Sequence, residues 1–557
     1  MPSSDSGVNS TMWPPGTVLL EEKTASGNSF ILQPRPTNDP NDPLNWPTWR
    51  KYLNLGLVCF WVALVAEFIN APTPTWSPMQ EELGYTDEVL NDSYAAGCAA
   101  LGVGSLVLIP FVLKFGRRPL YLICTVIQLA VSVWSAKMQT VTDLMLVNVI
   151  QCFFASLAET VVQMTIADVF FVHQRGRMNT IYVWVWLFAT YLGPLIAGFV
   201  AKGQGWRWVW WWNVVVFGVA VLVVAFGYEE TKYSPRAEAL ESVPVPDISE
   251  ASKVSDTLAN GKVVDKTKDD NDIEIASVPA LEATPLAINP TIPKKTYWQR
   301  LALTTPTSSD TESSFSFLQY TYQPLFLLAT IPAITFAALV YGILVGLGDV
   351  MSTTMSTFLP SSPYNFTSDQ VGLMHLPRMI GVTIGALITG PLSDWWIIYI
   401  SRRRNGVYEP ECRLWCVIPF LPFIPVGALL FGIGLDRGLP WIIIAVGLAL
   451  YNIGVTPINS LVVTYLTDSY REIIGPALVA VTLIRNAFST AFIFALTPWE
   501  DAIGLKYVLV TILLIACVIL SGFGVFIRWG KVFRERSADR YRASAGRQYR
   551  ERAGDNA

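Results

Sequence analysis

Twelve long apolar runs constrain this chain more than any other feature. A helix that crosses a bilayer needs about 20 mostly apolar residues, and short polar breaks separate most of the runs. The predicted spans lie near residues 52–71, 91–113, 119–138, 143–167, 178–201, 208–228, 323–348, 371–395, 413–434, 439–464, 473–497 and 505–528. The sequence therefore predicts an all-α membrane protein with twelve transmembrane helices.

The composition excludes the main soluble classes. The chain is 52% hydrophobic and 15% charged, with a net charge of −4, whereas soluble proteins carry about 25% charged residues. A soluble chain of 557 residues would divide into several domains, and this one lacks the charges to cover their surfaces. Its hydrophobicity excludes disorder of the whole chain, and its charge gives no support for nucleic-acid binding. The expected environment is a lipid bilayer.

One long polar break, residues 229–322, divides the spans into two sets of six. It is rich in Ser, Thr, Pro and charged residues, and such a segment cannot bury enough apolar surface to order itself. We expect a flexible tether, with regulation by phosphorylation as the alternative. The predicted organisation is a tail at 1–50, a six-helix bundle at 51–228, the linker at 229–322, a second six-helix bundle at 323–528 and a basic tail at 529–557.

The basic residues near the span ends predict the orientation. Lys and Arg concentrate on the side of both termini and the linker, which the positive-inside rule places in the cytoplasm. The first fifty residues contain no apolar stretch of the kind that a cleaved signal peptide needs. We expect a multi-pass protein of the plasma membrane. The sequon Asn365-Phe366-Thr367 then lies outside, where Asn365 is a candidate glycosylation acceptor.

The loop between the second and third spans recurs in the second half. The first copy is Lys114-Phe115-Gly116-Arg117-Arg118-Pro119, in which Gly116 permits a tight turn and Arg117 and Arg118 offer forks for carboxylates and helix-end carbonyls. The second copy begins Gly390-Pro391-Leu392-Ser393-Asp394 and continues to Arg402-Arg403-Arg404. The halves therefore look like divergent copies of one repeat, as in many carriers.

The fifth span contains a run of small residues around a proline, Ala189-x-x-x-Gly193-Pro194-Leu195-Ile196-Ala197-Gly198. Small residues four apart let two helices approach closely, and Pro194 permits a bend because it removes a backbone donor. A packed, kinked helix without a transport role explains these residues equally well.

On these motifs the chain resembles the major facilitator superfamily over nearly its full length. The paired loops resemble the inter-span motif of that family, and Gly193, Pro194 and Gly198 resemble the antiporter motif of drug–proton exporters. Asp42-Pro43-Leu44-Asn45-Trp46-Pro47 resembles the fungal drug–proton antiporter group, particularly its histidinol and polyamine carriers, as do the segments 168–176 and 406–411. The resemblance implies two pseudo-symmetric six-helix bundles and proton antiport.

Three positions depart from the family pattern. Leu113 occupies the usual acidic position of the first loop, whereas Asp394 retains it in the second. In the fourth span, Asn148 replaces the customary Arg and Cys152 the following Gly. If that Arg serves proton coupling in relatives, coupling here needs other residues.

Ionisable residues inside spans are costly and therefore mark candidate functional sites. Glu159 lies well inside the fourth span with Gln163 one turn on, which makes it a candidate proton or cation site. A structural hydrogen bond or ion pair is the equal alternative. Glu67 lies towards the outer part of the first span, where it can reach interfacial water. Arg485, in the eleventh span, is a candidate for a substrate anion or for a buried carboxylate, and we favour the ion pair.

Other polar and aromatic residues are weaker candidates. Asn452 and Asn459 belong to one polar stripe of the tenth span, expected to face a wet cavity. Tyr182 and Trp186 share a face of the fifth span, where an aromatic wall suits bulky or cationic substrates, although packing or lipid contact is the commoner reason. Asp349 is expected at the outer mouth of the seventh span.

No P-loop, metalloprotease motif or nucleophile elbow is present in the sequence. We expect no enzymatic activity, no metal site and no cofactor, with a proton gradient as the energy source. The predicted function is efflux of a small organic molecule (a drug, toxin or secondary metabolite) by a monomeric transporter that alternates in access. The alternatives are uptake or exchange of organic cations such as polyamines, and a nutrient sensor that does not transport.

Overall fold

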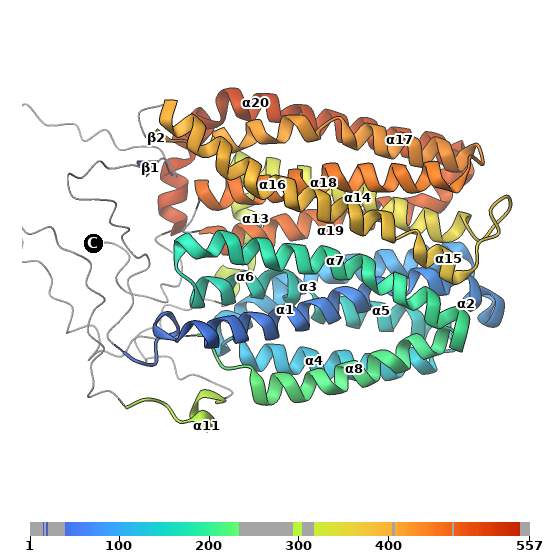
Figure 1. Cartoon of the computed structure of the whole chain (residues 1–557), viewed down its shortest axis with the longest axis horizontal. Coiled ribbons are helices and arrows are strands. Elements are labelled where there is room, and N and C mark those ends of the chain that lie inside the picture. Colours follow the sequence, from blue (N-terminus) through green and yellow to red (C-terminus); the bar gives the residue numbers. More distant parts are fainter. Residues whose placement is uncertain are drawn as a thin grey trace, which may run out of the picture.

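The computed structural model describes residues 15, 18–19, 39–232, 293–302, 317–403, 407–470 and 473–545. Its elements form two groups of helices that lie side by side, blue to green and yellow to red in Figure 1. The described part of the chain holds twelve helical segments long and apolar enough to cross a membrane. The prediction of an all-α protein with twelve spans is confirmed.

The first group contains ten elements and precedes a short helix that belongs to neither group. Its elements are η1 (Pro43–Asn45), α1 (Thr48–Asn70), η2 (Thr73–Thr75), α2 (Trp76–Leu83), α3 (Asp87–Phe115), α4 (Arg118–Lys137), α5 (Val141–Ala155), α6 (Leu157–Val169), α7 (Val172–Gln204) and α8 (Trp206–Gly227). The short helix is α11 (Tyr297–Arg300).

The second group is also made of helices. Its helices are α13 (Phe317–Thr330), α14 (Pro332–Phe358), α15 (Ser368–Leu373), α16 (Leu376–Arg403), η3 (Pro410–Phe420), α17 (Phe423–Asp436), α18 (Trp441–Ser469), α19 (Ile474–Ile503) and α20 (Leu505–Ala545). Two short strands, β1 (Val18–Leu19) and β2 (Val407–Tyr408), pair antiparallel with Val18 opposite Tyr408.

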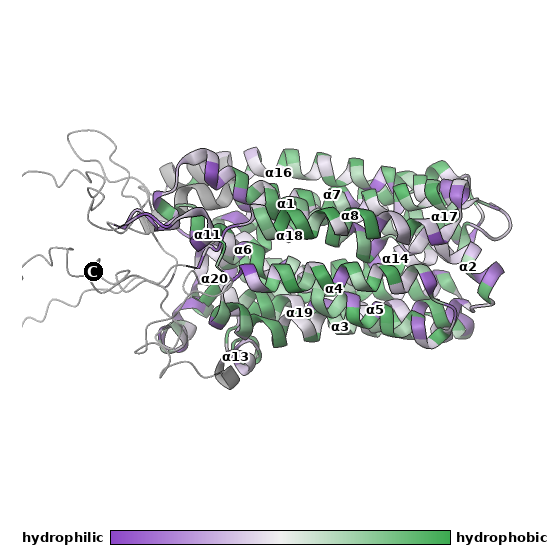
Figure 2. Cartoon of the chain, turned by 90° about the horizontal axis from the view of Figure 1, so that it is seen from below, coloured by the Kyte–Doolittle hydropathy of each residue, from purple (hydrophilic) through white to green (hydrophobic). Residues whose placement is uncertain are grey.

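Each bundle has its own hydrophobic core. One cluster of buried residues draws almost entirely on the first half, including Trp61, Phe68 and Phe217, and another on the second half, including Phe431 and Phe523. Large apolar side chains also cover the outside of the bundles, for example Leu387 at 69% exposure and Val518 at 72%. Figure 2 shows hydrophobic residues along the middle of the helices and hydrophilic ones gathered at both ends. This distribution fits a bilayer around the middle.

The two ends of the molecule are distinct. Helix α1 begins, and α3 and α20 end, at the left in Figure 1, which we call the terminal end. Helices α2 and α15 lie at the right, which we call the opposite end. Helix α3 ends at Phe115 and is followed by Gly116, whose positive φ of 104° suits glycine, and α4 begins two residues later at Arg118.

The seventh span lies later in the sequence than predicted. The apolar run from residue 323 divides at Ile331, and the membrane-length helix is α14, which begins at Pro332. Pro332 has no backbone donor, and the Thr335 hydroxyl donates to the carbonyl oxygens of Leu328 and Ile331. Hydropathy alone cannot detect this break because the residues on both sides are apolar.

Two more boundaries differ from the predicted ones. The fourth span is divided into α5 and α6 at Ser156, whose hydroxyl donates to the Phe153 carbonyl oxygen at 2.8 Å. The basic tail expected from residue 529 begins as a continuation of α20, which ends at Ala545. Arg534 in this extension is fully buried and forms an ion pair with Glu411 at 2.6 Å. Residues 233–292 and 303–316 of the predicted linker lie outside the described residues.

Candidate transport site between the bundles

The main contacts between the two bundles involve α3 and α7 of the first bundle. Helix α3 packs on α19, and α7 packs on α15 and α16. At the opposite end, Asn91 of α3 donates to the Thr497 hydroxyl of α19 at 3.1 Å. Midway along the same pair, a Cβ on Gly102 would lie 3.2 Å from the Cβ of Asn486. Several polar side chains are buried in this interface.

Glu159 and Arg485 form an ion pair that joins the bundles. The Arg485 guanidinium in α19 donates through Nη2 to Glu159 Oε1 in α6 and to Asn486 Oδ1 at 3.1 Å. Their side chains are only 5% and 10% exposed, respectively. Breaking such a pair leaves an uncompensated charge away from water, which is strongly unfavourable. The pair therefore makes contact between these bundles depend on the charge of Glu159.

The break at Ser156 explains the placement of Glu159. Because α6 starts at Leu157, Glu159 lies in its first turn, where the helix dipole favours a negative charge. Helix α3 packs closely at this point, since a Cβ on Gly104 would come within 2.3 Å of the Phe153 carbonyl oxygen and 2.7 Å of Ser156 Oγ. Only glycine allows this approach.

The residues predicted around Glu159 have different environments. Tyr182 is buried, and its hydroxyl donates to the backbone oxygens of Ala158 and Glu159 at 3.0 and 3.3 Å. Tyr182 therefore supports the start of α6. Gln163 and Trp186 are both partly buried, and neither has a side-chain hydrogen bond within the part of the chain that the structure describes.

A second polar cluster surrounds Tyr191 of α7. The Tyr191 hydroxyl donates to Asn452 Oδ1 in α18 at 2.8 Å, which is another link between the bundles. The Arg378 guanidinium lies 4.8 Å from the centroid of the Tyr191 ring and donates to the Gly348 carbonyl oxygen at 2.8 Å. His375 is 1% exposed, and both its ring nitrogens lack a partner among the described residues. The cluster thus contains buried hydrogen-bonding groups that other side chains leave unsatisfied.

Asp349 lies inside this interface rather than at the mouth of a span. The expected position was wrong because α14 starts at Pro332, which places Asp349 well within the helix. Ser489 Oγ of α19 donates to Asp349 Oδ2 at 2.6 Å. No ion pair joins Asp349 to a basic residue in the described ranges.

Two other predicted site residues form no hydrogen bond or ion pair with Glu159 or Arg485 among the described residues. Asn459 of α18 is partly buried, with its Oδ1 unpartnered in the described part of the chain. Glu67 of α1 is partly buried near Asn213 of α8, both within the first bundle. Its backbone lies against Gly193 of α7, where a Cβ would be 2.7 Å from the Glu67 carbonyl oxygen.

The antiporter-type motif forms a close seam at two places. Gly193 permits contact of α7 with α1 within one bundle, as described above. Gly198 permits contact with the other bundle, since a Cβ there would be 2.5 Å from the Ser368 carbonyl oxygen and 3.1 Å from the Cα of Gly372. The Pro194 carbonyl oxygen also lies against Gly372. Near this seam Lys202 forms a 2.9 Å ion pair with Asp369.

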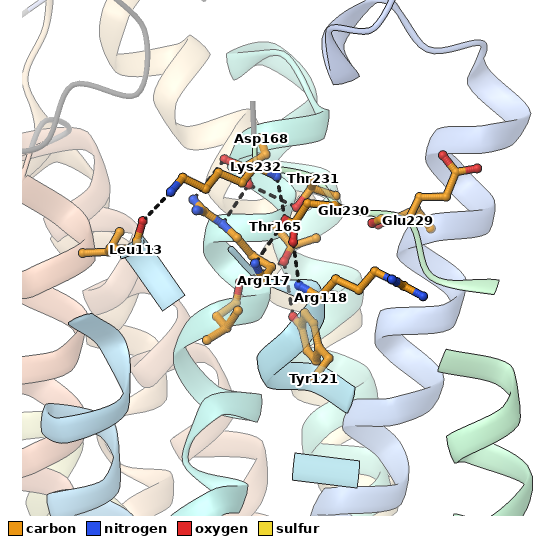
Figure 3. Close-up of polar contacts among 12 residues, drawn as sticks. Leu113, Arg117, Arg118, Tyr121, Thr165, Asp168, Glu229, Glu230, Thr231 and Lys232 are labelled. Atoms are coloured by element: carbon orange, nitrogen blue, oxygen red, sulfur yellow. Dashed lines mark hydrogen bonds and ion pairs between the residues drawn. The ribbon is translucent and has the colours of Figure 1, made fainter. Parts of the chain in front are cut away.

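The loop motif of the first half is held by residues that follow α8 (Figure 3). Glu230 accepts from the backbone N–H groups of Arg117 and Arg118, each at 3.0 Å, and so caps the start of α4. A Cβ on Gly116 would lie 2.5 Å from Glu230 Oε2, so this position also requires glycine. Lys232 Nζ donates to the carbonyl oxygens of Leu113 and Lys114 at the end of α3. Arg118 donates to the carbonyl oxygens of Ala225 and Tyr228.

Matching ion pairs relate the two halves. Arg117 Nε lies 3.1 Å from Asp168 Oδ2 at the end of α6. In the second half, Arg413 Nε lies 2.6 Å from Asp468 Oδ2 in α18, and Arg413 also donates to Ser393 Oγ at 3.0 Å. Gly390 has no atom within 4 Å of an added Cβ. The side chain of Asp394 lies outside the described residues.

Sequence reasoning identified single polar residues of these clusters but did not predict which of them lie together. Tyr191, Arg378 and Asp349 meet only because α7, α14, α16 and α18 pack together. The single sequence signal for each was a polar group in an apolar run. Glu230 was included in the predicted linker, and its pairing with the start of α4 has no local pattern. Within the described ranges, no group of three His, Cys, Asp or Glu residues is placed to hold a metal ion.

Comparison with known proteins identifies the family. A family model described as "Major Facilitator Superfamily" matches residues 56–489. An uncharacterized MFS-type transporter of Schizosaccharomyces pombe is 30% identical, with 95% of this chain and 94% of that protein covered. The MFS antiporter QDR3 of Candida albicans is 23% identical, with 90% and 81% covered. The solved proton:xylose symporter XylE has the same fold, with a TM-score of 0.53 at 12% identity, covering 86% of this chain and 97% of that one. The chain belongs to the major facilitator superfamily.

Proposed function

We propose that this protein is a secondary transporter that couples the entry of protons to the export of a small organic molecule. The observation that carries the proposal is the buried ion pair between Glu159 and Arg485, which links one bundle to the other. A carrier that alternates in access must make and break such contacts as its halves rock about a central site. A protonatable partner in the contact couples that motion to protons.

The coupling follows from the charge of Glu159. While Glu159 is ionised, attraction to Arg485 holds α6 against α19. When Glu159 takes up a proton it becomes neutral, the attraction is lost, and the state in which these helices separate becomes more populated. Proton binding to Glu159 and the opening of one side of the transporter are then linked. The proton gradient across the membrane therefore determines the direction of transport.

Two observations support export over import. Gly193, Pro194 and Gly198, which resemble the motif of drug–proton exporters, form the close seams of α7. A relative similar over most of its length is named an antiporter. Uptake or exchange of organic cations is the second candidate, because Asp349 adds a second carboxylate to the interface without an ion-pair partner in the described ranges.

We also propose that the terminal end faces the cytoplasm of a plasma-membrane protein. The basic residues of the loops gather on the side of both termini. Asn365 is exposed in the loop between α14 and α15 at the opposite end, which would then be outside and open to glycosylation.

The test is transport by purified protein in sealed vesicles with an imposed pH gradient and a clamped potential. Ethidium and Nile red serve as cationic and neutral probes. We expect the gradient to concentrate at least one probe through the wild type, and Glu159→Gln to abolish that gradient-driven flux. Glu81→Gln, an exposed carboxylate of α2 without a hydrogen-bond partner among the described residues, is the matched control and should transport normally. Equal flux through Glu159→Gln and the wild type would refute the coupling role.

A further inference from the structure

One face of α8 carries large apolar side chains that are exposed on the surface of the first bundle. Their exposed fractions lie between 50% and 60%, and their helical spacing places them in one stripe: Val215, Val219, Leu222 and Phe226. Such a stripe on a membrane-spanning helix faces the lipid tails. Because α8 ends at Gly227, the stripe ends where hydrocarbon meets water at the terminal end of the molecule.

The short segment 293–302, which contains α11, is attached at this border and lies outside both bundles (Figure 1). The Tyr297 hydroxyl donates to the carbonyl oxygen of Phe226, the last residue of the stripe. The backbone N–H of Lys295 donates to Asn41 Oδ1 at 2.8 Å, and Asn41 Nδ2 donates to the Pro293 carbonyl oxygen at 3.1 Å. These contacts hold the segment at one depth, beside the lipid-facing stripe of α8.

Two aromatic side chains of this segment are exposed. Trp298 is 71% exposed and Tyr297 is 47% exposed. Trp and Tyr are enriched at membrane–water interfaces, because their rings reach the apolar tails while their polar atoms stay hydrated. Burial of the Trp298 ring among lipids removes apolar area from water, which is favourable. The exposed Trp298 therefore suits a lipid environment at this depth.

The formal charge of the segment is positive. It contains Lys294, Lys295 and Arg300 and no Asp or Glu. Both lysine side chains are exposed, and neither forms an ion pair within the part of the chain that the structure describes. Arg300 lies 3.9 Å from Glu229, a carboxylate that also pairs with Arg50. The two lysine ammonium groups are thus free to bind an anion from outside the chain.

An anionic phospholipid has both an apolar part for Trp298 and an acidic headgroup for the lysines. A zwitterionic lipid supplies the acyl chains without net charge, and a free anion supplies the charge without the chains. We propose that residues 293–302 form a binding surface for anionic phospholipids, with Lys294 and Lys295 on the headgroup and Trp298 against the upper part of the acyl chains. The inference requires that α8 crosses the bilayer and is independent of the proposed transport function.

The bound lipid connects the membrane surface to the loop motif of the first half. Leu301, which directly follows α11, accepts a hydrogen bond from the Arg118 guanidinium through its carbonyl oxygen. Arg118 belongs to that motif and is 4% exposed. A lipid on residues 293–302 therefore stabilises a segment that the buried arginine of the motif also holds.

The test is photocrosslinking of the full-length protein in vesicles of equal parts phosphatidylserine and phosphatidylcholine. A trace of one or the other lipid carries a diazirine in an acyl chain, and mass spectrometry quantifies its adducts on residues 293–302 after proteolysis. A basic residue near an anionic surface contributes about a five-fold gain in affinity. We expect about five-fold or more phosphatidylserine adducts than phosphatidylcholine adducts in the wild type. Lys294→Gln/Lys295→Gln should lower this ratio about five-fold or more, whereas Trp298→Ala should lower both yields and keep the ratio.

The matched control is Lys137→Gln/Lys506→Gln, which removes the same charge at the opposite end and should keep the wild-type ratio. If Lys294→Gln/Lys295→Gln does not fold, Lys294→Gln alone should lower the ratio in the same direction. Equal yields from the two lipids in the wild type would overturn the inference, as would a wild-type ratio in the lysine variants or unchanged yields in Trp298→Ala. Inorganic phosphate that removes the phosphatidylserine adducts, when sodium chloride of the same ionic strength does not, would also overturn it, because the segment would then bind a free anion.

Discussion

The buried ion pair between Glu159 and Arg485 was partly predictable from the sequence. The sequence places Glu159 and Arg485 inside spans and favours a buried carboxylate as the partner of Arg485. It does not pair the two, because they are 326 positions apart and belong to different bundles. The pairing depends on how α6 packs against α19. Sequence patterns identify costly charges, but the long-range packing decides which charges meet.

Removal of one partner should cost more stability than removal of both. Arg485→Leu leaves Glu159 buried without a cation, and we expect a loss of about 3–5 kcal/mol in the free energy of unfolding. The double variant Glu159→Leu/Arg485→Leu removes both charges and should recover most of that loss. Thermal unfolding of the three proteins in detergent measures the difference. A double variant as unstable as Arg485→Leu would contradict the view that an unpaired charge causes the loss.

At the level of elements, the helix breaks determine which residues reach the interface. The break at Ser156 puts Glu159 in the first turn of α6, and the break at Ile331 moves Asp349 from a predicted mouth to the interior. Neither break alters mean hydropathy, so the predicted spans pass through both. Ser156 could have been noticed because a serine hydroxyl competes for helix carbonyls, and Pro332 because proline cannot donate.

The close contact of α7 with α15 at Gly198 can be tested by substitution of the glycine. Gly198→Ala adds a Cβ that would clash with the Ser368 carbonyl oxygen, so α7 and α15 must separate. We expect a loss of about 1–3 kcal/mol, the usual cost of overpacking. Gly203→Ala is the control on the same helix, since no atom lies within 4 Å of its added Cβ. It should keep or slightly raise the melting temperature. Equal melting temperatures for the two variants would show that the seam does not need glycine.

For the whole molecule, the sequence predicted the twelve spans and their division into two bundles, because both follow from hydropathy and from one polar break. The repeat was visible only as loop motifs, and the structure adds the equivalent pairs Arg117–Asp168 and Arg413–Asp468. Arg413 appeared in the sequence simply as a charge near a span end. Its partner is set by the packing of η3, α16 and α18, which no local pattern encodes.

The orientation of the molecule is testable with single cysteines at its two ends. Ser361→Cys lies in the exposed loop between α14 and α15, and Lys294→Cys lies just before α11 near the terminal end. If basic loops stay on the cytoplasmic side, a membrane-impermeant maleimide added to intact cells should label Ser361→Cys. Lys294→Cys should react only after permeabilisation. Labelling of the wild type measures the background from its seven native cysteines. Among the described helices, Cys517 is the exposed one. Labelling of Lys294→Cys in intact cells would show that the terminal end faces outward, opposite to the proposed orientation. The proton gradient would then drive the substrate in the opposite direction.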